Sequence, residues 1–131
     1  MFVDASAMIA ILVAEDDAEA LARRLEQAAE PVTSPIAIYE AVLGIARVAN
    51  LPIAAAEAIV ERFLDEAAVR VDPITAEIGR GAASAFERYG KGRHLAALNM
   101  GDCFAYACAQ ALDAPLLYKG NDFSRTDIAA A

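Results

Sequence analysis

Short apolar segments alternate with longer helical ones along this chain, and this alternation restricts its fold more than any other feature. Residues 1–4 and 115–118 are predicted to form short buried strands, and residues 69–71 are a third candidate. We expect helices over residues 6–13, 16–28, 35–49, 52–66, 75–89 and 101–112. Strands that alternate with helices form a parallel sheet covered by helices, so the fold class is α/β. A length of 131 residues favours one domain over residues 1–131.

Two segments stand out within this pattern. Ser34 is placed to cap a helix that starts at Pro35, and the residues up to Ala49 are apolar nearly all round. We therefore expect this helix to be central in the fold. The segment from Gly90 to His94 is glycine-rich and basic, and is predicted to be a mobile loop. The tail, residues 127–131, is predicted to add one more short strand.

Three acids stand almost alone in apolar sequence. Asp4 is the first charge in the chain and no other follows before Glu15. Glu40 shares residues 31–50 with one other charge, Arg47, and Asp102 is the sole charge from residue 95 to residue 112. Moving an ionised carboxylate out of water costs several kcal/mol or more unless something compensates its charge. A bound divalent cation would give these positions a joint purpose.

The predicted fold can bring these acids together with a fourth. In open parallel sheets, sites form outside the carboxyl ends of the strands. Asp4 ends the first strand, and Asp122 follows the strand predicted at residues 115–118. Asp102 begins a helix after a loop over the same edge, and Glu40 lies two turns into the helix from Pro35. The sequence thus predicts one acidic site made of four carboxylates.

Three of the four acids also have a possible structural role. Asp4 and Asp102 could cap helices, where an acid is favoured by the backbone N–H groups and the helix dipole. Asp122 could be a turn residue. Glu40 is neither a cap nor a turn residue. Taken together the four acids make an oxygen-only ligand set, which suits Mg²⁺ or Mn²⁺, one ion or two, and argues against zinc.

Several motifs resemble those of the PIN-domain family, and within it the ribonuclease toxins of bacterial VapBC toxin–antitoxin pairs. They are VDASA, YEAVLGIAR and the run LNMGDCFAYACAQALDAPLLYKGNDFSRTDI, together with the spacing of the acids. The resemblance covers essentially the whole chain. It implies a three-layer sandwich with a mainly parallel sheet of four to five short strands. It also implies a metal-dependent endoribonuclease whose catalytic and metal-binding acids are Asp4, Glu40, Asp102 and Asp122.

The resemblance implies partners as well. These are an RNA substrate cut to leave a 5′-phosphate and a 3′-hydroxyl, a second copy of the chain in a homodimer, and a VapB-type antitoxin. By the same likeness, the antitoxin would lie along the acidic groove, with a basic side chain reaching toward the acids. The expected location is the bacterial cytoplasm.

Three polar residues are predicted to support the acids. Ser6 stands where family members carry a small hydroxylated residue two after the first acid, so it would support Asp4 or a coordinated water. Asn99 could hydrogen-bond around the site. Asn121 stands where many relatives have an acid, and this departure affects an auxiliary contact.

The predicted roles of the basic and aromatic residues are less specific than those of the acids. Lys91, Arg93 and Lys119 are candidate contacts to RNA phosphates, with a solvated loop or an ion pair as the alternatives. His94 could be proposed as a general base, but metal-activated water removes the need for one. We expect three aromatic residues to pack in the core rather than stack on bases: Tyr39, Phe104 and Tyr106.

Composition narrows the remaining possibilities. The net charge of −8 argues against a protein that binds nucleic acid through bulk positive charge. It does not exclude a nuclease whose acids become locally cationic once metal is bound. No basic leader and no apolar run of about 18 residues is present, so neither a secretory signal nor a membrane span is predicted. Cys103 and Cys108 lie five residues apart and are expected to be reduced core thiols.

Two rival functions remain open at this stage. One is a phosphatase of the haloacid-dehalogenase type, in which a strand-end aspartate is the nucleophile. That chemistry usually has a second acid two residues later, where this chain has Ser6. The other is a PIN fold without catalysis that serves only to bind an antitoxin, which the complete set of four acids argues against.

Overall fold

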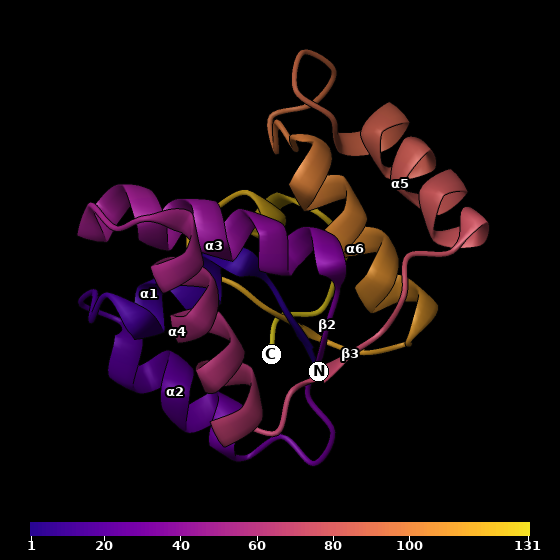
Figure 1. Ribbon diagram of the computed structural model, residues 1–131. Helices are drawn as coiled ribbons and strands as arrows, with labels where there is room; N and C mark the ends of the chain where they lie inside the picture. The colour runs from indigo at the N-terminus through magenta and orange to yellow at the C-terminus, as the bar shows by residue number, and fades with distance from the viewer.

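The computed structural model describes residues 1–131 as a four-stranded sheet surrounded by six helices and one short 3₁₀ turn (Figure 1). The elements in chain order are β1 (Phe2–Val3), α1 (Ala5–Leu12), α2 (Ala18–Glu26), β2 (Val32–Thr33), α3 (Pro35–Ala49), α4 (Ile53–Glu66), β3 (Arg70–Val71), α5 (Ala76–Tyr89), α6 (Met100–Ala111), β4 (Leu116–Leu117) and η1 (Phe123–Arg125).

All four strands run parallel in the order β3-β2-β1-β4. Phe2 of β1 pairs with Val32 on one side and with Leu116 on the other, so β1 lies in the middle of the sheet. The tail adds a single bridge between Leu116 and Ala130 rather than a further strand. The α/β class and the parallel sheet predicted from the sequence are confirmed.

Strand β2 was not predicted. Val32 and Thr33 are its only residues, and they stand directly before the cap at Ser34, so the helix signal hides them. The Thr33 hydroxyl donates a hydrogen bond of 2.9 Å to the carbonyl oxygen of Val3, which ties β2 to β1 beyond the backbone ladder. Because β2 leads straight into α3, it brings that helix to the carboxyl edge of β1.

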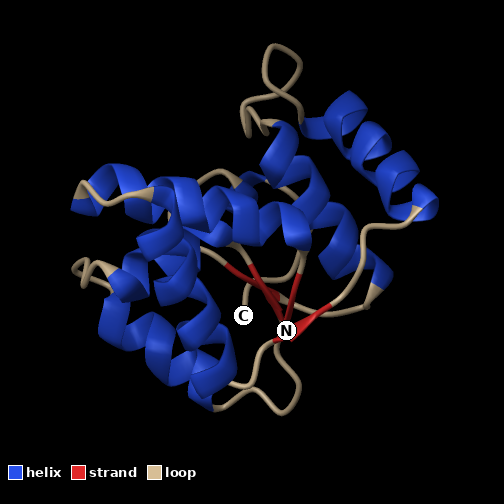
Figure 2. Ribbon diagram, in the orientation of Figure 1, coloured by secondary structure: helices blue, strands red, loops and turns tan.

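The helices form two groups around the sheet. In Figure 1, α1, α2 and α4 lie to the left, α5 lies along α6 on the right, and α3 runs between the two groups. Figure 2 shows the four short strands converging beneath α3. Gly44 of α3 faces Ile9 of α1 so closely that a Cβ at this position would clash with the isoleucine side chain. This missing side chain permits the tight contact of α1 with α3.

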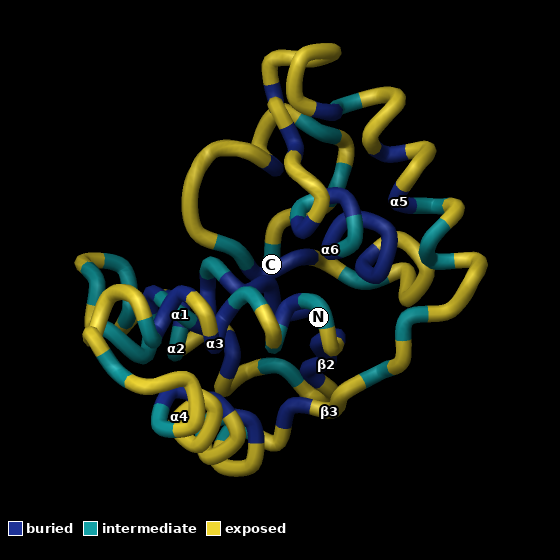
Figure 3. The backbone as a smooth tube through the Cα atoms, turned by 45° about the horizontal axis from the view of Figure 1, so that its top comes forward, coloured by how far each residue is buried: buried dark blue, intermediate teal, exposed yellow.

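Helix α6 is more deeply buried than α3. Seven of its twelve residues are buried, including Cys103, Tyr106 and Cys108, and Figure 3 shows it as the darkest helix. Helix α3 buries Ala37, Ala41, Val42, Gly44 and Ile45, but leaves large apolar side chains on its outer face exposed to solvent. Helix α3 does lie between the two helix groups, in contact with α1, α4 and α6, as a central helix should. Its outer face stays uncovered, because an apolar composition does not say which face of a helix is packed.

Two further predictions from the sequence concern the state of the cysteines and the presence of a membrane-spanning helix. Cys103 and Cys108 are buried and unpaired, as expected of core thiols. Burial raises the pKa of Cys108 to about 11, so its thiol stays protonated at neutral pH. None of the helices has both the length and the apolar character needed to cross a membrane.

Candidate metal centre

Three of the four predicted acids line one cleft. Asp4, Glu40 and Asp102 face a space of about 550 Å³ between the start of α1, the outer face of α3 and the first turn of α6. The other residues that line it are Ala5, Ser6, Ile9, Tyr39, Leu43, Gly44, Arg47 and Asn99. These acids are far apart in the sequence, and the short strands β1 and β2 bring two of them to the same edge of the sheet.

Asp4 is the most buried of the acids, with 5% of its surface exposed. It caps α1 through a hydrogen bond of 3.0 Å from the Ser6 amide, and the Ser6 hydroxyl donates to the same carboxylate oxygen. That hydroxyl in turn accepts from the Lys119 amide, 3.0 Å away, just beyond β4. Burial raises the pKa of Asp4, and the hydrogen bonds from Ser6 only partly offset that rise. The cap predicted as an alternative role therefore coexists with a place in the acidic cleft.

Glu40 is half-buried, and its carboxylate rests against the backbone of Gly101. A Cβ at position 101 would overlap the carboxylate where it now lies, so a larger residue there would displace the Glu40 side chain. Burial, and to a lesser extent the negative charges of Asp4 and Asp102, raise the pKa of Glu40 to about 7. Ionising Glu40 therefore costs more in the fold than in water, and a bound cation would lower that cost.

Asp102 stands at the third position of α6 rather than at its start. Its side chain accepts from the Asn99 amide at 3.0 Å, while the Asn99 side chain accepts from the Asp102 amide at 2.9 Å, a reciprocal capping box. Burial raises the pKa of Asp102 to about 6; the Asn99 hydrogen bond opposes this, and the charges of Asp4 and Asp122 add to it. Helix start and acid cluster thus depend on the same two side chains.

Asp122 lies outside the cleft lining, on the exposed segment before η1. Its negative charge nevertheless raises the pKa of both Asp4 and Asp102. Asp122 thus acts electrostatically on two of the other acids. The sequence predicted one site made of four acids; three of them line the cleft, and Asp122 lies outside its lining.

The acids do not form a finished coordination sphere. No group of three or more Asp, Glu, His or Cys side chains is close enough to hold a metal ion jointly. The donor set still suits a hard divalent cation, since every donor is oxygen and no cation pairs with the carboxylates of Asp4, Glu40 or Asp102. A cation bound there would relieve the repulsion that raises the pKa of these acids.

The residues predicted to support the site have defined places. Ser6 bonds Asp4, and Asn99 bonds Asp102 and lines the cleft. Asn121 is exposed, and its backbone oxygen accepts from the Ser124 hydroxyl at 2.6 Å. Its side chain lies outside the cleft lining.

The three predicted RNA contacts differ in their surroundings. Lys91 and Arg93 are exposed on the loop before Asn99 and make no ion pair. The ammonium group of Lys119 contacts Glu15 and Asp17, so it is engaged in a local ion pair. This pair was one of the alternatives that the sequence left open.

The loop that carries Lys91 and Arg93 has more internal contacts than expected. Gly90 pairs with Leu98, and the Ala96 amide donates to the His94 ring nitrogen Nδ1 at 3.0 Å. The ring of His94 also packs edge-on against Tyr89. The loop is thus held by its own hydrogen bonds, and His94 does not line the cleft.

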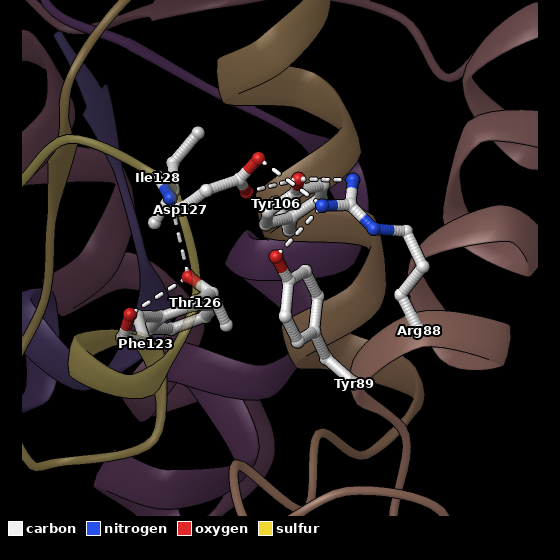
Figure 4. Close-up of polar contacts among 7 residues, drawn as sticks. All are labelled: Arg88, Tyr89, Tyr106, Phe123, Thr126, Asp127 and Ile128. Atoms are coloured by element: carbon white, nitrogen blue, oxygen red, sulfur yellow. Dashed lines mark hydrogen bonds and ion pairs between the residues drawn. The ribbon is translucent and has the colours of Figure 1, made fainter.

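One polar cluster was missed by the sequence reasoning. The Tyr106 hydroxyl donates to Asp127 at 2.6 Å, and Arg88 donates to Asp127 at 3.2 Å and to the Tyr89 hydroxyl at 2.8 Å (Figure 4). These contacts join α5, α6 and the segment after Asp122. Tyrosine and arginine side chains 18 residues apart give no local pattern, so only the packing of α5 on α6 reveals the cluster.

Comparison with known proteins identifies this arrangement. The model for the PIN domain matches residues 1–129. The chain belongs to the PIN-domain family. A PIN-family relative, Ribonuclease VapC36 of Mycobacterium tuberculosis, is 42% identical over 129 residues, which cover 98% of this chain and 91% of VapC36. The VapC ribonuclease R02377 of Rhizobium meliloti is 39% identical, over 97% of this chain and 98% of its own length. The resemblance to VapC-type PIN proteins stated from the sequence is confirmed.

Two solved structures share the PIN fold. The crystal structure of Mycobacterium tuberculosis VapC20, described as a sarcin–ricin loop cleaving toxin, superposes with a TM-score of 0.77 at 20% identity and covers 99% of this chain and 97% of VapC20. A toxin–antitoxin complex from Klebsiella pneumoniae gives a TM-score of 0.74 at 15% identity, over 99% of this chain and 95% of the matched one. At such identities the likeness establishes the fold.

Proposed function

We propose that this PIN-domain protein is a metal-dependent endoribonuclease and the toxin of a toxin–antitoxin pair. The observation that carries the proposal is the cleft in which Asp4, Glu40 and Asp102 face one another without a compensating cation. Full-length relatives at 42% and 39% identity bear the name of ribonuclease, which supports RNA as the substrate.

Four acids are assigned to the divalent metal: Asp4, Glu40 and Asp102 in the cleft, and Asp122 at its rim. Mg²⁺ and Mn²⁺ are the ions that this oxygen-only set fits best. When bound, such an ion supplies an activated water and neutralises charge on the leaving oxygen of a phosphodiester.

The chain's own residues prepare the site for that chemistry. Ser6 fixes one oxygen of Asp4 and leaves the other free, and Asn99 fixes one oxygen of Asp102 in the same way. Gly101 leaves the space that the Glu40 carboxylate occupies. Ser6, which donates a hydrogen bond to Asp4, occupies the position where a phosphatase of the haloacid-dehalogenase type would carry its second acid. The serine therefore favours the nuclease over the phosphatase.

The partners follow from the same assignment. We expect an antitoxin that covers the acidic cleft with a basic side chain, because a cation at that place would satisfy the carboxylates as a metal does. A toxin–antitoxin complex among the structural neighbours supports a partner of this class. A homodimer and action in the bacterial cytoplasm remain part of the proposal.

The test is cleavage of RNA by the purified chain. Total RNA from the host is incubated with the protein in Mn²⁺, in Mg²⁺ and in EDTA, and new 5′ ends are mapped. We expect discrete cuts that require metal and disappear in Asp4→Asn. Asp16→Asn is the matched control, since Asp16 is exposed and makes no hydrogen bond or ion pair. Cutting by Asp4→Asn at the parent rate would overturn the assignment.

A further inference from the structure

The outer face of α3 forms one wall of the acidic cleft, and its exposed side chains are not explained by metal binding. Tyr39, Glu40, Leu43 and Arg47 all line the cleft from this helix. Eight residues separate Tyr39 from Arg47, about 12 Å along a helix axis. Glu40 lies at one end of this wall beside Tyr39, so the wall extends away from the acids along the cleft.

Tyr39 does not pack in the core, and the expectation from its sequence that it would was wrong. Its surface is 62% exposed, although it stands on a helix whose other face is buried. Its hydroxyl makes no hydrogen bond, and its ring contacts no other aromatic ring. An exposed tyrosine next to a cleft presents a flat aromatic face, which is the surface that unpaired bases stack on.

Arg47 is the single basic residue among those that line the cleft. Its guanidinium is exposed and forms neither a hydrogen bond nor an ion pair. The nearby acids do not hold it: Arg47 is not among the charges that act on Glu40, Asp4 or Asp102. A free arginine at the side of an acidic cleft can bind a phosphate without neutralising the carboxylates.

We propose that this wall of α3 is the binding surface for single-stranded RNA beside the scissile bond, with a base stacked on Tyr39 and a backbone phosphate held by Arg47. This inference rests on the proposed function, because it takes RNA as the substrate. The wall combines a stacking surface with one cation, as proteins that bind single strands do. Double-stranded RNA has no unstacked base to offer Tyr39, so the wall favours loops and unpaired segments.

The experiment measures binding without cleavage. All variants carry Asp4→Asn, and binding of a 5′-fluorescein-labelled 12-nucleotide RNA of mixed sequence is followed by anisotropy in Mg²⁺ over a series of salt concentrations. Tyr39→Leu, which keeps an apolar side chain, is expected to weaken binding at least about fivefold with an unchanged salt dependence, since stacking is worth about 1–3 kcal/mol per base. Tyr39→Phe should bind as the parent does.

Arg47→Gln is expected to weaken binding and also to reduce the slope of log K against log salt by about 0.7, the contribution of one phosphate contact on a single strand. Arg80→Gln is the matched control, because Arg80 is also exposed and unpaired but lies on α5 outside the cleft. It should change neither affinity nor slope by a comparable amount.

The outcomes separate this proposal from the proposed function. Parental affinity and slope in both Tyr39→Leu and Arg47→Gln would overturn the RNA-binding wall, even if the wild-type chain cleaves RNA through Asp4. Loss of binding to the antitoxin encoded beside this chain, with RNA binding intact, would reassign the wall to the antitoxin and likewise overturn it. Failure of the chain to cleave any RNA would instead count against the proposed function itself.

Discussion

Two aspartates that contact α6 or belong to it have opposite electrostatic surroundings. Asp102, in the first turn of the helix, is surrounded by other carboxylates, and burial with these charges raises its pKa to about 6. One turn later, Tyr106 donates a hydrogen bond to Asp127, which also pairs with Arg88, and these contacts lower the pKa of Asp127. The difference is one of compensation. The chain pairs Asp127 with a cation and leaves Asp102, the acid that we assign to a ligand, without one.

The first prediction compares two variants, one that removes the charge of Asp102 and one that removes the charge of Asp127. Asp102→Asn should reduce the rate of RNA cleavage at least about a hundredfold, because loss even of groups that support a metal ligand costs about 10–100-fold. Asp127→Asn should leave the rate within a few fold, since its contacts are structural. Single-turnover cleavage in Mn²⁺, at a temperature well below both melting points, measures this. Equal losses in the two variants would contradict the division between a ligand site and a structural cluster.

Removal of one hydroxyl tests the structural side of the comparison. Tyr106→Phe deletes the donor to Asp127 and should lower the free energy of unfolding by about 1.5 kcal/mol, as expected for a partly buried hydrogen bond to a charged group. Urea denaturation gives the value. Tyr89→Phe is the control, because its hydroxyl accepts from Arg88 on the surface and should cost less. The idea fails if Tyr106→Phe is as stable as the parent.

The pH dependence of stability tests the acidic cleft that contains Glu40 and Asp102. The folded-state pKa of Glu40, about 7, lies above its ordinary value of 4.5, so the folded chain binds more protons than the unfolded one between these limits. Its contribution to stability is therefore present at low pH and is lost as pH rises toward 7. Asp102 contributes in the same direction.

Glu40→Gln should accordingly stabilise the metal-free protein at pH 8, by about 1 kcal/mol once solvent screening is allowed for. This corresponds to about 3–5 °C in Tm for a chain of this size. It should also flatten the fall in Tm between pH 5 and pH 7.5. Calorimetry in EDTA measures both effects, with Glu57→Gln on the exposed face of α4 as the control. A less stable Glu40→Gln at pH 8 would show that the acids are not in mutual repulsion.

The smallest effect concerns Lys119. Because its ammonium pairs with Glu15 and Asp17 near the surface, where solvent screens the pair, Lys119→Gln should change the melting temperature very little. It should leave the KM for RNA unchanged, in contrast to Arg47→Gln, whose guanidinium is free. A raised KM in Lys119→Gln would restore the RNA contact that the sequence suggested for this residue.

Several parts of the site could be anticipated from local signals in the chain. The isolation of Asp4, Glu40 and Asp102 in apolar sequence indicated that burying each carboxylate would cost free energy unless a ligand compensated its charge. The predicted strand ends placed Asp4 and Asp122 at one edge of the sheet. The structure places three of these acids in one cleft. The acids that pair with Lys119 and the exposure of Tyr39 could not be anticipated, because an ion pair across 104 residues and the exposure of one helix face leave no local sequence pattern.

Local sequence was enough to predict the α/β class, the helix cap at Ser34 and the isolated acids, because caps, strand runs and unpaired charges depend on neighbours in the chain. Three features follow from tertiary packing instead: the deep burial of α6, the place of Tyr39 and Arg47 beside the acids, and the hydrogen bonds of Tyr106 and Arg88 to Asp127. These outcomes depend on which face of each helix the sheet and its neighbours cover, and that is fixed by packing between segments far apart in sequence.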